Sequence, residues 1–301
     1  MFNEETIAKL VANCPVNQFE IEGIDVKDDG RLSDYIDAVE KIVMDDLSSF
    51  GPQIVRSKVS SELQLLESIP EIRNHALFVD FSSAVFNYGI STHPHDDQPY
   101  LSFSRLMHNV IAVSRGLANA MFSEDVPGAL ALLRQLYETY IVIVFLCLHP
   151  ELAAAYSDHR WVSQYHLASA FDIKMDDSVY VKQYERVTRE YDPVFLTDYG
   201  WAAPAFTKKS RPVLLDLVKD VKLEHFSSIY RLGSDAIHSS SYFVADQPGQ
   251  DPFLRLTCAA AIEMLTTALS DYVTAMKYTQ KERVVTMSLA FAMKTDLETG
   301  L

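Results

Sequence analysis

The sequence predicts an all-α protein, built as a multi-helix bundle. Apolar residues recur with helical spacing along most of the chain, and no segment shows the alternation typical of a half-buried β-strand. The chain has only 10 Gly and 12 Pro in 301 residues, whereas a many-turned β-protein needs more turn residues. Its 48% hydrophobic and 22% charged residues are typical of a folded chain, large enough for one domain or two.

Proline and glycine define the boundaries of the predicted elements. Pro52, Pro70, Pro127 and Pro150 each lie at the start of a helical pattern, and Gly89 is predicted to end one. The predicted helices cover residues 3–13, 33–47, 52–69, 70–88, 100–121, 127–148, 150–174, 178–190, 212–221, 224–240 and 252–280, with a short helical fragment after residue 281. The predicted connections are residues 14–30, 91–99, 191–212 and 241–252.

The overall charge and the cysteines restrict the functional classes. A net charge of −15 repels nucleic acid on average, so RNA or DNA binding requires a local basic site. Cys14, Cys147 and Cys258 lie far apart and form no CxxC motif, which excludes a disulfide framework and a zinc ribbon. The longest apolar run, residues 140–148, is shorter than the roughly twenty residues of a membrane span. We therefore predict a cytoplasmic protein that does not enter a membrane.

Several common catalytic motifs are missing from the sequence. It has no P-loop, no GxGxxG, no HExxH and no nucleophile elbow. Nucleotide-driven motors, dinucleotide-dependent oxidoreductases and α/β hydrolases therefore have no support, and we predict no cofactor.

Two predicted helices carry charged residues on a shared face. Arg134 and Glu138 lie four residues apart in the most apolar helix, where buried charges must be paired or line a cavity. They form either a structural ion pair or the lining of a polar pocket. In the late helix, Arg231 and His238 lie two helical turns apart, with Asp235 and Ser234 between them. A guanidinium, an imidazole and a carboxylate on one face are the parts of a general acid–base site, although they also occur together on ordinary surfaces.

Residues 159–166, HRWVSQYH, combine charge with aromatic rings. Arg160 and Trp161 are candidates to contact a phosphate and a base; the alternative is that Trp161 belongs to the core and Arg160 is solvated. In the loop at residues 91–99, His93, His95 and Asp96 carry metal-ligating atoms and suggest a metal-dependent hydrolase. A solvated loop explains the same residues, and we predict no metal site.

One tight basic cluster, TKKSRP at residues 207–212, is either a local positive site or a solvated loop.

The motif of the late helix resembles that of a known superfamily. The spacing Arg-x6-His in a C-terminal helix of an all-α protein is similar to the HEPN motif, Arg-x(4–6)-His. More narrowly, LLRQLYET (132–139), AYSDHRW (155–161) and YRLGSDAIHSSS (230–241) resemble an all-helical bacterial family of unknown function, over about residues 105–275. HEPN nucleases usually carry a polar residue after the arginine, whereas Leu232 stands here.

The HEPN resemblance implies a fold, an activity and a partner. It implies an N-terminal helical section (1–98) followed by a HEPN-like domain (99–301) that forms a homodimer. It also implies metal-independent RNA cleavage in antiphage defence or toxicity, with Arg231 and His238 as the catalytic pair. Asp235, Ser234, Arg134, Glu138, Arg160 and Trp161 are predicted to contact the substrate or shape the pocket. Many HEPN-like domains are inactive, so the alternative is a non-catalytic module that binds a partner protein or a small ligand.

Overall fold

The computed structural model is all-α, as predicted. It describes residues 4–14, 35, 37–39, 41–42, 69–93, 97–171, 179–206, 211–237 and 251–299, and these ranges contain no β-strand. The chain packs into two compact units: unit 1 contains Met1–Pro94, Leu106–Tyr140 and Phe226–Leu301, and unit 2 contains His95–Arg105 and Ile141–His225. The units are interleaved along the chain, and the division into residues 1–98 and 99–301 stays a prediction.

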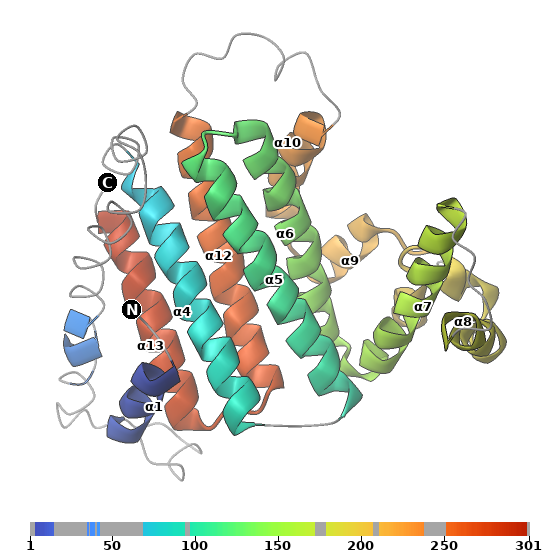
Figure 1. Ribbon diagram of the computed structural model, residues 1–301, viewed down its shortest axis with the longest axis horizontal. Helices are drawn as coiled ribbons and strands as arrows, with labels where there is room; N and C mark the ends of the chain where they lie inside the picture. The colour runs from blue at the N-terminus through green and yellow to red at the C-terminus, as the bar shows by residue number, and fades with distance from the viewer. Residues whose placement is uncertain are drawn as a thin grey trace. The chain divides into compact units, whose positions relative to one another are not determined.

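Long helices make up unit 1. Its described helices are α1 (Glu4–Asn13), α4 (Pro70–Thr92), most of α5 (Gln98–Phe122) and of α6 (Val126–Leu148), α10 (Ser227–Ile237), α12 (Asp251–Ala275) and α13 (Gln280–Thr299). Helix α4 packs against α1, α12 and α13, and within this unit α4, α5, α6 and α12 run side by side (Figure 1). Large side chains fill the core between them, among them Tyr137, Tyr272, Tyr278, Phe78, Phe81 and Met107.

Some predicted boundaries in unit 1 are wrong, among them those at Gly89 and after residue 281. Gly89 does not end its helix, because α4 continues to Thr92. The glycine instead makes room for a neighbour: a Cβ at position 89 would lie 1.8 Å from the hydroxyl oxygen of Tyr278, which donates a hydrogen bond to the carbonyl oxygen of Val85. The region after residue 281 is not a short fragment either, since α13 extends over Gln280–Thr299.

Within the part of the chain that the structure describes, two helices are long and apolar enough to cross a membrane by length and composition. They are Val126–Leu148 and Pro252–Ala275, and most of the apolar window in each, 61% and 56%, is buried inside the protein. Core helices of soluble proteins have the same character, so these helices give only weak support for a membrane location. The cytoplasmic location stays a prediction.

Unit 2 consists of short helices arranged around α7. Its complete elements are η1 (Pro150–Leu152), α7 (Ala153–Ala170), α8 (Val179–Glu190), η2 (Pro193–Leu196), η3 (Gly200–Ala205) and α9 (Leu214–Asp220), where η denotes a 3₁₀ helix; η4 (Glu224–Phe226) spans the end of this unit. Helix α7 packs against α8 and all three of η1, η2 and η3. The helix predicted over residues 150–174 begins instead as the 3₁₀ turn η1, and α7 ends at Ala170. The predicted connection 191–212 contains the two 3₁₀ helices η2 and η3.

Candidate functional site

Helix α10 carries the first part of the predicted Arg-x6-His motif. Arg231 and Asp235 are exposed, whereas Ile229 and Gly233 are buried within unit 1. Arg231 makes no hydrogen bond or ion pair with any residue that the structure describes. His238 lies outside the described residues, so its position relative to Arg231 stays a prediction.

Arg134 joins α6 to α10. Its Nε donates a hydrogen bond to Oε1 of Glu138 at 3.0 Å, and its Nη2 donates one to the hydroxyl of Tyr230, also at 3.0 Å. The guanidinium carbon lies 4.6 Å from the centre of the Tyr230 ring, a cation–π distance. Burial alone lowers the pKa of Arg134, but Glu138 and Tyr230 outweigh it and raise the pKa overall. Arg134 therefore acts as a paired cation that holds the two helices together.

Gly233 allows α10 to approach α6 closely. A Cβ at this position would lie 2.6 Å from the Cβ of Arg134 and 2.6 Å from the carbonyl oxygen of Leu130, closer than real Cβ atoms come. One turn earlier, the ring of Tyr230 lies 5.9 Å from that of Tyr137. Ser234 donates its hydroxyl hydrogen to the carbonyl oxygen of Tyr230, at 2.9 Å, within the helix. The inner face of α10 is thus fixed by packing, and Arg231 lies on its outer face.

The HRWVSQYH segment on α7 divides into a buried and an exposed part. His159 is buried, and its Nε2 lies 2.8 Å from the carbonyl oxygen of Thr197, which accepts its hydrogen. Burial lowers the pKa of His159, as expected for a neutral imidazole that holds η2 against α7. Arg160 is exposed, with its guanidinium carbon 4.4 Å from the centre of the half-buried Trp161 ring. Arg160 and Trp161 belong to unit 2 and Arg231 to unit 1, so a pocket shared by them stays a prediction.

Asp158, next to these residues, connects α7 to α8. Its two carboxylate oxygens accept hydrogen bonds from Arg186 at 2.6 and 3.1 Å, and Oδ2 accepts a third from the hydroxyl of Tyr191 at 3.0 Å. The hydrogen bonds and negative charges of Asp158 and Glu190 outweigh burial and raise the pKa of Arg186. Asp158 is thus occupied by Arg186 and Tyr191.

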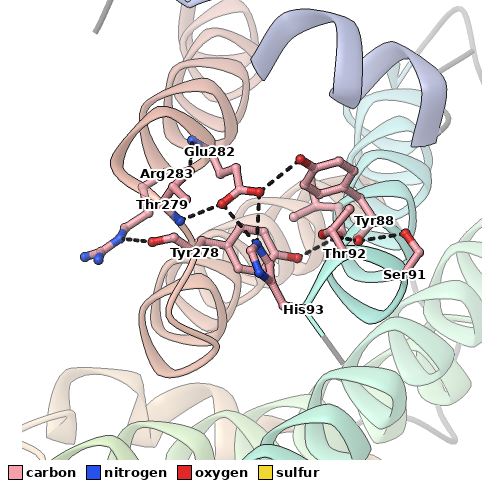
Figure 2. Close-up of polar contacts among 9 residues, drawn as sticks. Tyr88, Ser91, Thr92, His93, Tyr278, Thr279, Glu282 and Arg283 are labelled. Carbon is pink, nitrogen blue, oxygen red and sulfur yellow. Dashed lines mark hydrogen bonds and ion pairs between the residues drawn. The ribbon is translucent and has the colours of Figure 1, made fainter. Parts of the chain in front are cut away.

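His93, proposed from sequence as a metal ligand, belongs to a buried polar cluster in unit 1 (Figure 2). Its Nε2 lies 2.9 and 3.0 Å from the two carboxylate oxygens of Glu282. The same carboxylate accepts hydrogen bonds from the hydroxyl of Tyr88, at 2.9 Å, and from the backbone N–H of Thr279, at 2.5 Å. In this arrangement His93 ties the end of α4 to the start of α13.

The remaining metal candidates and the two lysines of the basic cluster lie outside the described residues. These are His95, Asp96 and the lysines within residues 207–210. Among the residues that the structure describes, no group of three or more His, Cys, Asp or Glu side chains is placed to hold a metal ion.

Replacing Arg134 with lysine is expected to lower the free energy of unfolding by about 1 kcal/mol, because one ammonium cannot reproduce two fixed hydrogen bonds to Glu138 and Tyr230. Urea unfolding followed by circular dichroism measures the change. Arg189→Lys, at an exposed position on α8, is the matched control and should leave the midpoint unchanged. Equal stability of Arg134→Lys and the unmodified protein would show that the contact does not hold α10 in solution.

Sequence reasoning missed several residues of these clusters, among them Tyr230 and Glu282. Tyr230 precedes Arg231 directly and was not assigned a role, and Glu282 lies in a region expected to be a fragment. Each of them contacts a partner more than 50 residues away in the chain. Tyr230 and Arg134, for example, are 96 residues apart. The local sign of the contact with α6 was the position of Tyr230, which directly precedes Arg231 and lies on the same helix face as Gly233.

Comparison with known proteins matches part of the chain to a protein family. No curated protein and no solved structure matches the chain. A family described as a family of unknown function, DUF5677, matches residues 100–250, which is half of the chain. The matched range includes both Arg134 and Arg231. The chain therefore belongs to the DUF5677 family of unknown function.

Proposed function

We propose that the protein is a metal-independent endoribonuclease of the HEPN type, with Arg231 and His238 as its catalytic pair. In this proposal it acts in the cytoplasm as a homodimer, in antiphage defence or as a toxin. The observation that supports it is the exposed guanidinium of Arg231, which has no acidic partner among the described residues, on a helix fixed at its inner face by Gly233 and Arg134.

The proposed chemistry needs only these two side chains. The imidazole of His238 removes the proton from a ribose 2′-hydroxyl, the 2′-oxygen forms a bond to the adjacent phosphorus, and the bond from phosphorus to the 5′-oxygen breaks. The protonated His238 then gives this proton to the leaving 5′-oxygen, and the products are a 2′,3′-cyclic phosphate end and a free 5′-hydroxyl. Arg231 holds the phosphate and stabilises the negative charge that develops on its oxygens.

The test is cleavage of single-stranded RNA in the presence of EDTA. We expect the unmodified protein to cleave RNA to 2′,3′-cyclic phosphate ends, and His238→Ala to reduce the rate by roughly 100-fold to 10,000-fold, the usual contribution of a general acid–base group. Arg231→Ala should lower the rate as well. His225→Ala, an exposed histidine on η4, is the matched control and should retain the rate.

Cleavage by the unmodified protein that disappears in EDTA, or that survives His238→Ala unchanged, would contradict the proposal. Circular dichroism of each variant distinguishes loss of the site from loss of the fold. Sedimentation of the unmodified protein tests the homodimer independently of activity.

One observation favours the alternative, a non-catalytic binding module. Unit 2 exposes large apolar side chains on and next to α7 and α8, including Leu167 (59% exposed), Phe171 (70%) and Val179 (65%). Exposed apolar side chains that lie near one another mark surfaces that bind other proteins. If neither the unmodified protein nor His238→Ala cleaves any RNA, the binding module is the better interpretation.

A further inference from the structure

Two arginines of unit 2 converge on one stripe of α7. Arg105, at the start of α5, is exposed and reaches Ser157 with its Nη1, at 3.5 Å from the hydroxyl oxygen. Arg160 lies one helical turn after Ser157 and is also exposed. Because residues three apart lie on the same face of a helix, the two guanidinium groups share one region of the surface.

Neither arginine forms an ion pair with a residue that the structure describes. The nearest carboxylate in sequence, Asp158, is occupied by Arg186 and Tyr191. Burial lowers the pKa of Arg160, and the positive charges of Arg105 and Arg186 lower it further, against the opposing effect of Asp158. The region is thus locally positive in a chain whose net charge is −15.

Trp161 is the aromatic neighbour of the Arg160 guanidinium. The guanidinium lies over the indole ring, at 4.4 Å from its centre. Stacking uses the flat face of the guanidinium and leaves its N–H groups, which point outward in the plane, able to bind two phosphate oxygens. The ring of Tyr180, 46% exposed, lies 5.8 Å from that of Trp161, and offers a face on which an unpaired base can stack.

We propose that Arg105, Arg160, Trp161 and Tyr180 form a binding site for single-stranded RNA, in which the arginines hold backbone phosphates and Tyr180 stacks on a base. The inference rests on the proposed function, because it supplies the local positive site that an acidic ribonuclease needs to hold its substrate. The site lies entirely within unit 2 and uses none of the proposed catalytic residues.

The test is binding of a fluorescein-labelled oligouridine to the His238→Ala protein in EDTA, followed by fluorescence anisotropy at several salt concentrations. Arg160→Ala in the same background is expected to weaken binding about tenfold and to reduce the slope of log affinity against log salt by about 0.7, the value for one phosphate contact on a single strand. Arg105→Ala should have a similar effect. Tyr180→Ala should weaken binding with no change of the salt slope, because stacking releases no counterions.

Arg189→Ala on α8 is the matched control, since it removes one exposed positive charge from the same unit. It should change the affinity less than twofold. The proposal would be overturned if Arg160→Ala and Arg189→Ala lowered the affinity equally. It would also be overturned if the His238→Ala protein with all four site residues intact did not bind oligouridine. If inorganic phosphate competes as strongly as unlabelled oligouridine, the site binds phosphate alone. If duplex RNA binds as tightly as single-stranded RNA, base stacking is excluded.

Binding and cleavage separate this inference from the proposed function. If RNA binds through Arg160 but is never cleaved, the catalytic proposal fails and the binding site stands. If RNA is cleaved in EDTA through His238 while Arg160→Ala binds normally, the binding site fails and the catalytic proposal stands.

Discussion

Replacing Glu282 with alanine is expected to lower the free energy of unfolding by about 2–4 kcal/mol, because several hydrogen-bond donors inside the protein lose their acceptor. The side chain of Glu282 is buried and receives hydrogen bonds from Tyr88 and from the backbone of Thr279, and it pairs with His93. Without the carboxylate, the buried hydroxyl of Tyr88 and the half-buried imidazole of His93 lose this acceptor (Figure 2). Urea unfolding followed by circular dichroism measures the loss.

The pH dependence of stability gives a second measure of the same interaction. Burial alone raises the pKa of Glu282, but the hydrogen bonds from Thr279 and Tyr88 and the charge of His93 outweigh it, and the pKa in the folded protein lies below its ordinary value of 4.5. The ionised form therefore favours the folded state. Its contribution is fully present above pH 4.5 and is lost as the pH falls through the lower pKa of the folded protein. The difference between the unmodified protein and Glu282→Ala should shrink over that acidic range.

Glu5→Ala is the matched control for this prediction. Glu5 pairs with Lys9 on the exposed surface of α1, at 2.7 Å, in the same unit. Exposed pairs of this kind contribute little to stability. The control variant should unfold at the same urea concentration as the unmodified protein. If Glu282→Ala behaves in the same way, α4 and α13 are not joined through this cluster in solution.

Replacing Gly233 with alanine is expected to lower the free energy of unfolding by about 1–3 kcal/mol, the cost of inserting a methyl group where packing leaves no room. The new methyl group would lie 2.6 Å from the carbonyl oxygen of Leu130, a backbone atom of α6 that cannot rotate away. To relieve the clash, α10 must move from α6, which weakens the hydrogen bond between Arg134 and Tyr230. The displacement should also lower RNA cleavage, because Arg231 lies on the same helix.

Gly116→Ala provides the comparison, because it is the same substitution at another helical glycine of unit 1. A Cβ there would lie 3.6 Å from the nearest atom, a side-chain methyl group of Leu132, which is an ordinary contact distance. This variant should be stabilised by up to about 1 kcal/mol, because alanine loses less backbone entropy than glycine in a helix. Urea unfolding of both variants, together with the cleavage assay, checks the pair of predictions. Similar stabilities for the two variants would show that α10 is not packed closely on α6.

Local patterns in the sequence predicted most of the helices and one contact of the candidate site. Arg134 and Glu138 were predicted to share a face because they lie four apart on a regular helix, and the structure joins them at 3.0 Å. The wrong boundaries have a different cause. Gly89 is a common signal for the end of a helix, but here it is required by the hydroxyl of Tyr278, 189 residues later in the chain. Nothing near Gly89 in the sequence distinguishes these two uses of glycine.

By itself, the sequence determined the fold class, the approximate order of the helices and the face that Arg231 and Asp235 share, because helical periodicity depends on neighbours within a few residues. Only the tertiary structure decided that Tyr230 holds Arg134 and that His93 pairs with Glu282 and ties α4 to α13. It also brought Arg105 to the face of α7 that carries Arg160. Each of these contacts joins residues far apart in the chain, and their proximity depends on how whole helices pack, which no short stretch of sequence specifies.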